Sequence, residues 1–467
     1  MPAWQKAIIV FAVVGVVVMA IVLGVLYGKP QAKAEAEADA ESDAADATSA
    51  TTVASETAVG ASVAETEADA PVLLSLEYKL QGSKLVGEVA AASQGQGRSV
   101  ALSADGTTLA SGGYGDDTNT GAVWIFTRNG TGDWTPQGSK LICDTPGNNQ
   151  RQGFSVALSA DGNTLASGAY IDTTSTGAVW IFTRNEAGEW TQQGGKLVGT
   201  PTTTFQLQGY SVALSADGNT LASGGRLDGA AVSQTGAVWV FTRDETGAWE
   251  QQGLKLVGTP TANDQFQGSA VALSADGNTL ASAGYGDSSN TGAVWIFTRS
   301  GTTWSPQAKL VGEALDTSQR QGASIALSAD GNTLISGGYG DTGYVGAVWV
   351  FRRNGTTWGQ ENKFTPPDDK VLNSGTAHFG YAVGLSGDAR VMVVAARNDD
   401  ADNGALWAYL DTGDGFALYG GKFRPEDADP GSEVADALAL SYNGTTLAVG
   451  VEEEGPTFTG AAWVYVT

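Results

Sequence analysis

Carboxylates recur along the chain at the end of similar runs, such as ASGGYGD, and tyrosines often stand next to them. The acidic positions and the tyrosines of interest are Asp116, Asp172, Asp228, Asp287, Asp341 and Asp399, with Tyr114, Tyr285 and Tyr339. Such side chains could bind cations or a basic partner, and a pair of carboxylates could serve a glycosidase. Because every copy of the run carries an acid, no catalytic pair is singled out. The pattern therefore predicts a binding surface.

Other side chains that perform chemistry are scarce. The chain has one histidine, His378, which removes most histidine-based metal sites and catalytic triads. Its one cysteine, Cys143, excludes an internal disulfide. We therefore expect no catalytic residues, no metal and no cofactor. The net charge of −25 repels phosphate backbones, so nucleic acid is not an expected partner, whereas a basic protein is.

A repeat must position the acidic runs. The stretch SVALSADGNTLASG, residues 211–224, recurs seven times with decay. Its turn residue falls at Asp105, Asp161, Asp217, Asp276, Asp330, Asp388 and Asn443. The steps between these positions are 56, 56, 59, 54, 58 and 55 residues. A period of this regularity predicts one supersecondary unit per copy, stacked against its neighbours.

The third copy predicts four antiparallel strands. Residues 211–215 and 220–223 are short β-runs joined by Asp217-Gly218, which we interpret as a two-residue hairpin turn. Residues 236–243 (GAVWVFTR) and 249–258 (WEQQGLKLVG) are the third and fourth strands. Four antiparallel strands per copy are typical of a propeller blade. The predicted fold is an all-β, seven-bladed propeller spanning residues 71–467.

Tryptophans follow the same period. Seven occupy one position of the third strand: Trp124, Trp180, Trp239, Trp295, Trp349, Trp407 and Trp463. Five more begin the fourth strand: Trp134, Trp190, Trp249, Trp304 and Trp358. Stacking of sugars on these rings is conceivable, but a residue present in every blade favours core packing.

The last copy has no fourth strand of its own, because residues 460–467 (GAAWVYVT) match the third strand. Residues 77–87 (EYKLQGSKLVG) match a fourth strand, DWTPQGSKLIC, with Tyr78 in the place of the tryptophan. We therefore expect the N-terminal strand to complete the seventh blade. Closure of this kind removes exposed sheet edges.

The first seventy residues form no part of the repeat. Residues 7–27, from Ala7 to Tyr27, carry no charge and are long enough to cross a bilayer as a helix, preceded by a short flank at 1–6. A cleaved signal peptide is the alternative, with an A-x-A site at residues 32–34. Residues 28–70 are rich in Ala, Glu and Thr and predict a disordered acidic stalk.

The repeat resembles the FG-GAP repeat of integrin-α-like seven-bladed propellers. The resemblance rests on QG(F/Y)SVALS, ASGGYGD and GAVWIF, with FG kept at Phe379-Gly380. It implies an adhesion or ligand-recognition module, usually outside the cytosol. Calcium-binding members carry several alternating acids between strands one and two. Here that loop is Ala-Asp-Gly-Asn, so we expect no calcium there.

Together these features predict a non-catalytic recognition module, displayed from a membrane with its propeller extracellular or luminal. The acidic, tyrosine-bearing loops between strands two and three are the expected binding face for a basic protein or another extracellular ligand. Two alternatives stay open. One is a carbohydrate-active propeller enzyme, which a buried carboxylate pair in one blade would favour. The other is an intracellular scaffold.

Overall fold

The structure is a computed structural model, and it describes residues 77–88, 93–147, 149–200, 205–230, 233–259, 264–313, 318–367 and 376–467. The chain separates into Met1–Val72 and Leu73–Thr467 as two units. All described residues belong to the second unit. The segments predicted as a membrane span and a stalk, residues 7–27 and 28–70, lie outside the described residues. No helix in the described part of the chain is long and apolar enough to span a membrane.

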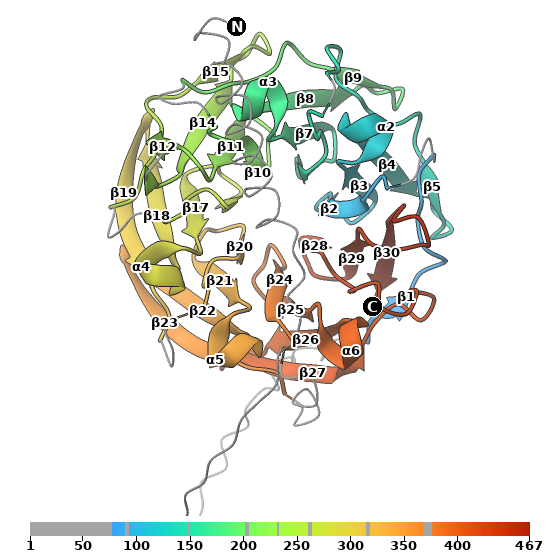
Figure 1. Cartoon of the computed structure of the whole chain (residues 1–467), viewed down its shortest axis with the longest axis vertical. Helices are drawn as coiled ribbons and strands as arrows, with labels where there is room; N and C mark the ends of the chain where they lie inside the picture. Colours follow the sequence, from blue (N-terminus) through green and yellow to red (C-terminus); the bar gives the residue numbers. More distant parts are fainter. Residues whose placement is uncertain are drawn as a thin grey trace, which may run out of the picture. The chain divides into compact units, whose positions relative to one another are not determined.

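Seven four-stranded antiparallel sheets surround one axis, as Figure 1 shows, so the predicted propeller is confirmed. The innermost strands are β2 (Gln96–Leu102), β6 (Ser155–Leu158), β10 (Gln208–Leu214), β16 (Ala270–Leu273), β20 (Ser324–Leu327), β24 (Phe379–Leu385) and β28 (Ala437–Leu440). The second strands are β3 (Thr108–Gly113), β7 (Thr164–Ala169), β11 (Thr220–Gly225), β17 (Thr279–Gly284), β21 (Thr333–Gly338), β25 (Val391–Ala396) and β29 (Thr446–Val451). The third are β4 (Ala122–Arg128), β8 (Ala178–Arg184), β14 (Ala237–Arg243), β18 (Ala293–Ser300), β22 (Ala347–Asn354), β26 (Ala405–Asp411) and β30 (Ala461–Val466). The outermost are β5 (Trp134–Pro136), β9 (Trp190–Gln192), β15 (Trp249–Gln251), β19 (Thr303–Leu310), β23 (Thr357–Phe364), β27 (Phe416–Phe423) and β1 (Lys79–Leu80).

The seventh blade is completed from the other end of the repeat region, as expected. Strand β1 pairs antiparallel with β30, with Lys79 opposite Val466 and Leu80 opposite Tyr465. The Tyr78 hydroxyl donates to the Gly444 carbonyl at 2.6 Å. Each of the seven blades therefore has four strands, and none of them is incomplete.

The turn between the first two strands differs from the expected two-residue hairpin. In the third blade, Ser215 N–H donates to the Thr220 carbonyl, so four residues separate this pair. Only Gly218 takes a positive φ, of 65°, whereas Asp217 does not. The Asp217 carboxylate instead accepts from the Ser215 hydroxyl at 2.5 Å and from Asn219 N–H at 3.0 Å. The aspartate is therefore a turn-forming acceptor, because its hydrogen bonds close the loop on itself.

The seven third-strand tryptophans are core residues. Each is at most 4% exposed. A glycine in the connection from the fourth strand lies against several of the rings. A β-carbon at Gly87 would stand 1.9 Å from Trp124, and one at Gly199 would stand 2.0 Å from Trp239. The packing of one indole per blade therefore needs a residue without a side chain opposite it.

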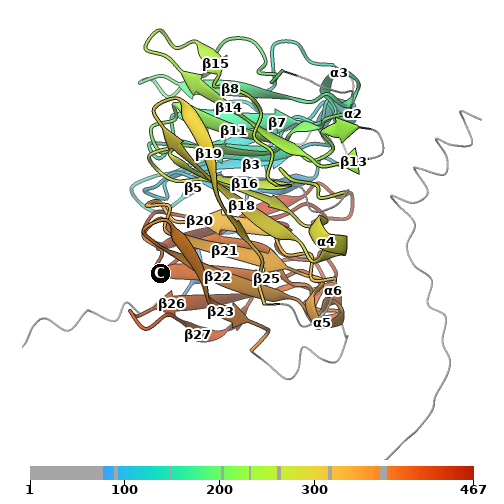
Figure 2. The same cartoon turned by 90° about the vertical axis from the view of Figure 1, so that its left-hand side faces the viewer.

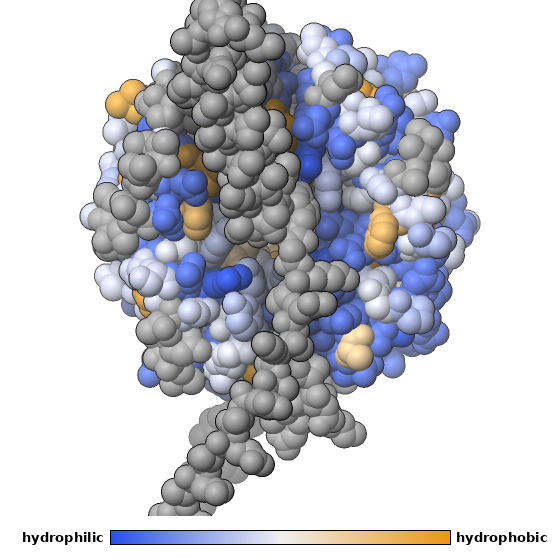
Figure 3. Space-filling view, viewed as in Figure 1, coloured by the Kyte–Doolittle hydropathy of each residue, from blue (hydrophilic) through white to orange (hydrophobic). Residues whose placement is uncertain are grey.

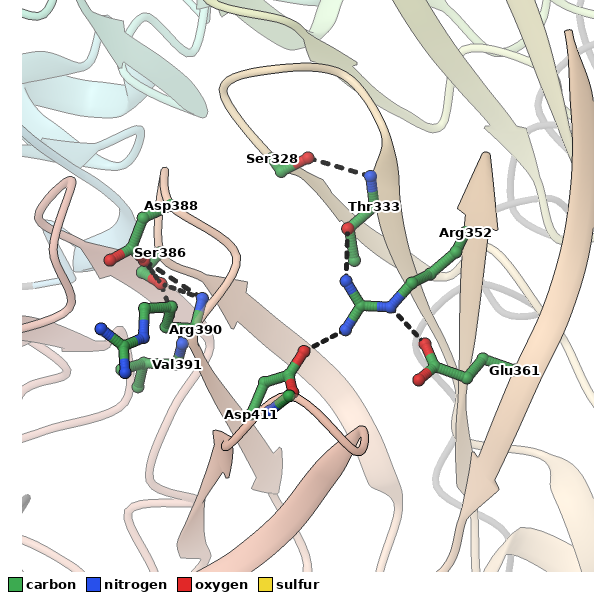
Figure 4. A network of polar contacts seen from close by, with 10 residues as sticks. Ser328, Thr333, Arg352, Glu361, Ser386, Asp388, Arg390, Val391 and Asp411 are labelled. Atoms are coloured by element: carbon green, nitrogen blue, oxygen red, sulfur yellow. Dashed lines mark hydrogen bonds and ion pairs between the residues drawn. The ribbon is translucent and has the colours of Figure 1, made fainter. Parts of the chain in front are cut away.

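Polar side chains join neighbouring blades on the face that carries the Asp-Gly turns. Figure 4 shows Arg352 of the fifth blade between Glu361 and Asp411, the latter at the end of the third strand of the sixth blade. Its Nη1 also donates to the Thr333 hydroxyl at 3.2 Å. In earlier blades an arginine at the end of the third strand lies over a tryptophan ring, as Arg184 does over Trp190 at 5.4 Å. Arg128, Arg243 and Arg299 lie in the same way over Trp134, Trp249 and Trp304.

Candidate functional site

The loops between the second and third strands all lie on one face of the ring (Figure 2). Five of them contain a short turn: α2 (Asp116–Asn119), α3 (Asp172–Ser175), α4 (Asp287–Asn290), α5 (Asp341–Tyr344) and α6 (Asp399–Asp402). These turns are left-handed in part, since Asp117 and Thr118 have φ of 45° and 57°. The third blade has the hairpin β12 (Gly229–Ala230) and β13 (Ser233–Gln234) instead. The predicted binding loops therefore share one face.

The aspartates predicted to bind a partner begin these loops, one per blade. All six are at most 4% exposed, and each carboxylate pairs with a lysine from the outer part of its own blade. The pairs are Asp116–Lys140, Asp172–Lys196, Asp228–Lys255, Asp287–Lys309, Asp341–Lys363 and Asp399–Lys422. In the seventh blade Glu454 pairs with Lys84 at 2.8 Å. The same ion pair thus recurs in every blade.

The aspartates also hold the backbone of their loops. The aspartate carbonyl also accepts the N–H of the glycine that opens the third strand, as Asp116 does from Gly121 at 2.9 Å. Reversing the charge of Asp116 would therefore break a buried pair and a loop together. That substitution reports on folding as well as on binding, so the binding role of these six residues stays a prediction.

The central channel has a uniform floor. Each innermost strand contributes a consecutive triplet, such as Val100-Ala101-Leu102 of the first blade, and all seven triplets line a cavity of about 280 Å³. The outer residues of the triplet are Val, Ile or Leu in every blade, with Ala or Gly between them. Because all seven blades contribute apolar residues of similar size here, the floor is explained by packing between the blades.

The channel opens on the face that carries α2 to α6, and the lining of this mouth differs from blade to blade. A pocket of about 460 Å³ opens there. One register position, three residues before the channel-floor alanine or glycine, places a different side chain in the pocket from nearly every blade: Arg98, Phe154, Tyr210, Ser269, Ala323, Tyr381 and Asp436. The repeat is therefore conserved within the chain up to this ring, and it diverges where the channel opens.

A second ring of positions follows the end of the second strand and surrounds the same mouth. Its members are Tyr114, Tyr170, Arg226, Tyr285, Tyr339, Arg397 and Glu452. Arg226, Tyr285 and Tyr339 line the pocket directly. The predicted residue Tyr114 lies next to it, with its ring 5.7 Å from that of Phe154. Tyr285 and Tyr339 are thus predicted site residues that the fold brings to one pocket.

A third position around the mouth has strained backbone. The residue three before the first ring has φ between 53° and 62° in all seven blades: Gly95, Arg151, Leu207, Phe266, Arg320, His378 and Glu433. Six of these are not glycine, and each holds a conformation that side chains rarely adopt. In the first five blades this residue lies between two buried glutamines, whose side chains can anchor the loop. Gln152, for example, accepts from Cys143 N–H at 2.9 Å.

One arc of the mouth, formed by the sixth, seventh and first blades, is a cluster of alternating charges. Arg98 pairs with Glu452 at 3.2 Å, and Arg397 pairs with Asp436 at 3.3 Å and with Glu433 at 2.7 Å. The Asp436 carboxylate accepts the backbone N–H of Glu452 at 2.8 Å. Burial raises the pKa of Asp436 to about 7, and the Glu452 charge adds to this while Arg397 opposes it.

The opposite arc, formed by the second to fifth blades, has arginines among tyrosines. Arg226 lies 4.4 Å over the Tyr210 ring and donates to the Tyr285 hydroxyl at 2.9 Å. Arg320 donates to the Tyr339 hydroxyl at 2.6 Å. No ion pair joins Arg226 or Arg320 to a carboxylate of the described residues. This arc therefore presents cations whose neighbours are uncharged.

Outside the pocket, the rim of the same face is mainly hydrophilic. Figure 3 shows apolar residues there as separate spots between polar ones. Among the described residues, Phe205 and Phe458 are 56% and 53% exposed, but they belong to different blades. The described residues of this rim form no broad apolar docking area, so the pocket is what distinguishes the described part of this face.

Sequence reasoning missed most of the mouth. It singled out Tyr285 and Tyr339 because they adjoin the acidic run, but it did not select Arg98, Arg226, Arg397 or Asp436. A signal was present: when the seven copies are aligned, the position of Arg98 and Asp436 changes from Arg to Phe, Tyr, Ser, Ala, Tyr and Asp, whereas the residue before it is glycine in six of the seven copies. Variation at a register position of an internal repeat marks a place that packing leaves free.

The comparisons with known proteins agree with this architecture. Residues 358–409 match the family model of the FG-GAP repeat, from the outermost strand of the fifth blade through the third strand of the sixth. A search of curated proteins found no significant match. The matched repeat and the seven-bladed ring confirm the resemblance to integrin-α-like propellers. This fold suggests a protein-interaction module.

Proposed function

We propose that the chain is a non-catalytic recognition module whose ligand binds at the channel mouth. The observation that carries this proposal is the gathering of non-repeating side chains, including Arg226 and Asp436, in one pocket of an otherwise repetitive ring. Packing favours the same residue types in every blade, so side chains that differ from blade to blade around one opening favour selection for a ligand.

We further propose a setting for the module, which its sequence pattern supports. In this proposal residues 7–27 anchor the chain in a membrane, residues 28–70 form a stalk, and the propeller is extracellular or luminal. The partner is a basic protein, which the net charge of −25 would attract, or another extracellular ligand. Protease treatment of intact membranes tests this placement. Cleavage of the propeller only after lysis would contradict it.

Recognition at the mouth has its own test. The full chain, a mouth variant (Arg226→Tyr with Tyr339→Ala) and an opposite-face variant (Arg299→Gln) are each used to capture extracellular material, which is quantified by mass spectrometry. A ligand of the mouth is retained by the native chain and by Arg299→Gln and is lost from the mouth variant. Equal capture by all three proteins would contradict the proposal.

A carbohydrate-active enzyme is the second candidate, and one observation favours it. Asp436 and Glu452 are neighbouring carboxyl groups of a single blade at the pocket, and the pKa of Asp436 is raised to about 7, near the range that suits a general acid. Against this role, each carboxyl is engaged by an arginine, Asp436 by Arg397 and Glu452 by Arg98. Hydrolysis of a glycoside panel by the native chain, abolished in Asp436→Asn, would favour the enzyme.

A further inference from the structure

We propose that the mouth pocket binds a carboxylate group through Arg226, with the body of the ligand against tyrosine rings. The pocket of about 460 Å³ has the size of known small-ligand sites, and Arg226, Tyr210, Tyr285 and Tyr339 belong to its wall. The inference rests on the proposed function only in placing the ligand at this mouth.

Arg226 is held in place by uncharged groups. Tyr285 accepts from its Nη1 at 2.9 Å, and the Tyr210 ring lies 4.4 Å from its Cζ, so the guanidinium is oriented before any ligand arrives. Its Nε is buried and has no hydrogen-bond acceptor among the described residues. A largely buried cation without a carboxylate partner is costly, and an anionic ligand would remove that cost.

Comparison between blades shows that this arginine is not required by the fold. Four blades carry tyrosine at the position of Arg226: Tyr114, Tyr170, Tyr285 and Tyr339. The sixth blade carries Arg397, which has three carboxylates around it, Glu433, Asp436 and Glu453. The fold therefore accepts tyrosine at this position, and the structural arginine of the sixth blade is surrounded by carboxylates. Arg226 has none of them.

The charges of the pocket favour a singly charged, planar anion. A guanidinium presents its N–H groups in one plane and matches a carboxylate. Asp436 shares the same pocket, and Glu452 lies next to Asp436, so a doubly charged phosphate would meet like charge. The local arrangement decides here, since interactions between exposed charges fade over about 8 Å at physiological salt.

The remaining wall recognises the ligand body by shape and stacking. The serine hydroxyls of the wall donate to backbone carbonyls: Ser155 to Gly209 at 2.8 Å and Ser211 to Gly268 at 2.8 Å. Their donors are therefore committed to joining the blades. Tyrosine faces remain for contact, and they suit a sugar ring or the aliphatic part of an acidic side chain.

The test titrates the full chain with pairs of probes that differ only in charge, by calorimetry. One arm uses glucuronate against glucose, and the other uses an acidic tetrapeptide against its glutamine analogue, both with amidated C-termini so that the side chains carry the only carboxylates. We expect an acid to bind with a Kd of about 1 mM or tighter and its neutral counterpart to bind at least about tenfold more weakly. The arm that shows this difference identifies the source of the carboxylate.

Variants then assign the effect to Arg226. Arg226→Tyr, which copies the residue of four other blades, should weaken the acid by about tenfold or more, while Arg226→Lys should retain part of the affinity. Arg299→Gln removes the same charge from the opposite face and should leave the affinity unchanged. If Arg226→Tyr does not fold, Tyr285→Phe replaces it, because it removes only the hydroxyl that orients Arg226.

Three results would overturn the inference: no acid binds, phosphate binds more tightly than every acid, or Arg226→Tyr binds the acid as the native chain does. These results leave the proposed function intact if the mouth variant still loses a captured partner. Conversely, acid binding at Arg226 without any capture of extracellular material would support the carboxylate site and contradict recognition of a partner.

Discussion

The two arcs of the channel mouth use arginine in opposite ways. In the arc of the sixth, seventh and first blades, Arg98 and Arg397 are surrounded by Asp436, Glu433 and Glu452. In the arc of the second to fifth blades, Arg226 has tyrosines as neighbours. In the first arrangement the arginines are neutralised by carboxylates of the protein. In the second the arginine has no carboxylate partner among the described residues, so a ligand could supply the negative charge.

This difference separates structural from ligand-directed charge without any alignment of relatives. A charge that the fold requires is neutralised where it is buried, as the lysine–carboxylate pair is in every blade. A charge that the fold leaves without a counter-charge beside a pocket has a cost that folding alone does not explain. Substitutions in each arc test whether the two arcs differ in this way.

The largest effect is expected on stability from Arg397→Leu. This change leaves Asp436 and Glu433 without their shared cation, and removal of one partner of a buried pair costs about 3–5 kcal/mol. Arg226→Tyr should cost less than about 1 kcal/mol, since its position accepts tyrosine elsewhere. Urea denaturation measures both. Similar losses of unfolding free energy would erase the distinction between the arcs.

The pH dependence of stability should identify Asp436. Its pKa is raised by folding from 3.8 to about 7, so the native state holds a proton that the unfolded chain releases between these values. The stabilising contribution is therefore present at low pH and is lost as pH rises toward 7. Relative to the native chain, Asp436→Asn should gain on the order of 3 kcal/mol of stability between pH 4 and pH 8.

The same proton should modulate binding. Below pH 7, protonation of Asp436 removes a negative charge from the pocket, whose wall also contains Arg98, Arg226 and Tyr381. Binding of an acid probe should then tighten severalfold from pH 8 to pH 6 in the native chain, and it should be pH-independent over this range in Asp436→Asn. Calorimetry at both pH values measures this. An equal pH response in the two proteins would exclude Asp436 as the source.

A smaller effect is expected from one of the repeated pairs. Lys309→Met leaves the buried Asp287 without its ammonium at 2.8 Å and should cost about 2 kcal/mol, less than a fully buried pair because water reaches the lysine. The double variant with Asp287→Asn should recover part of that loss. No recovery would mean that the lysine acts through packing of its chain rather than through its charge.

The smallest effect is expected from Arg320→Gln at the rim. Arg320 bonds the Tyr339 hydroxyl and has no ion pair among the described residues, so its removal should change stability by less than about 0.5 kcal/mol. Thermal unfolding of this variant beside Arg397→Leu gives the two extremes. A large loss from Arg320→Gln would show that the tyrosine arc also holds structural charge.

Much of the fold could be predicted from the sequence because its repeat is so regular. The spacing of the Asp-Gly turns, the tryptophan of each third strand and the match of residues 77–87 to a fourth strand together predicted seven blades and their closure. The turn at Asp217 was misjudged, because a side-chain hydrogen bond and one left-handed glycine favour a four-residue loop over a two-residue one.

The candidate site was predicted only in part. The sequence by itself determined which residues recur, and recurrence is a property of local pattern and packing. Only the tertiary structure decided that Asp116 and its equivalents form ion pairs with lysines of their own blades, and that Arg226, Tyr285 and Asp436 meet at one opening. These residues come from blades far apart along the chain. Their meeting depends on which side chains of separate blades face the same opening, and the repeat pattern of a single blade does not specify this.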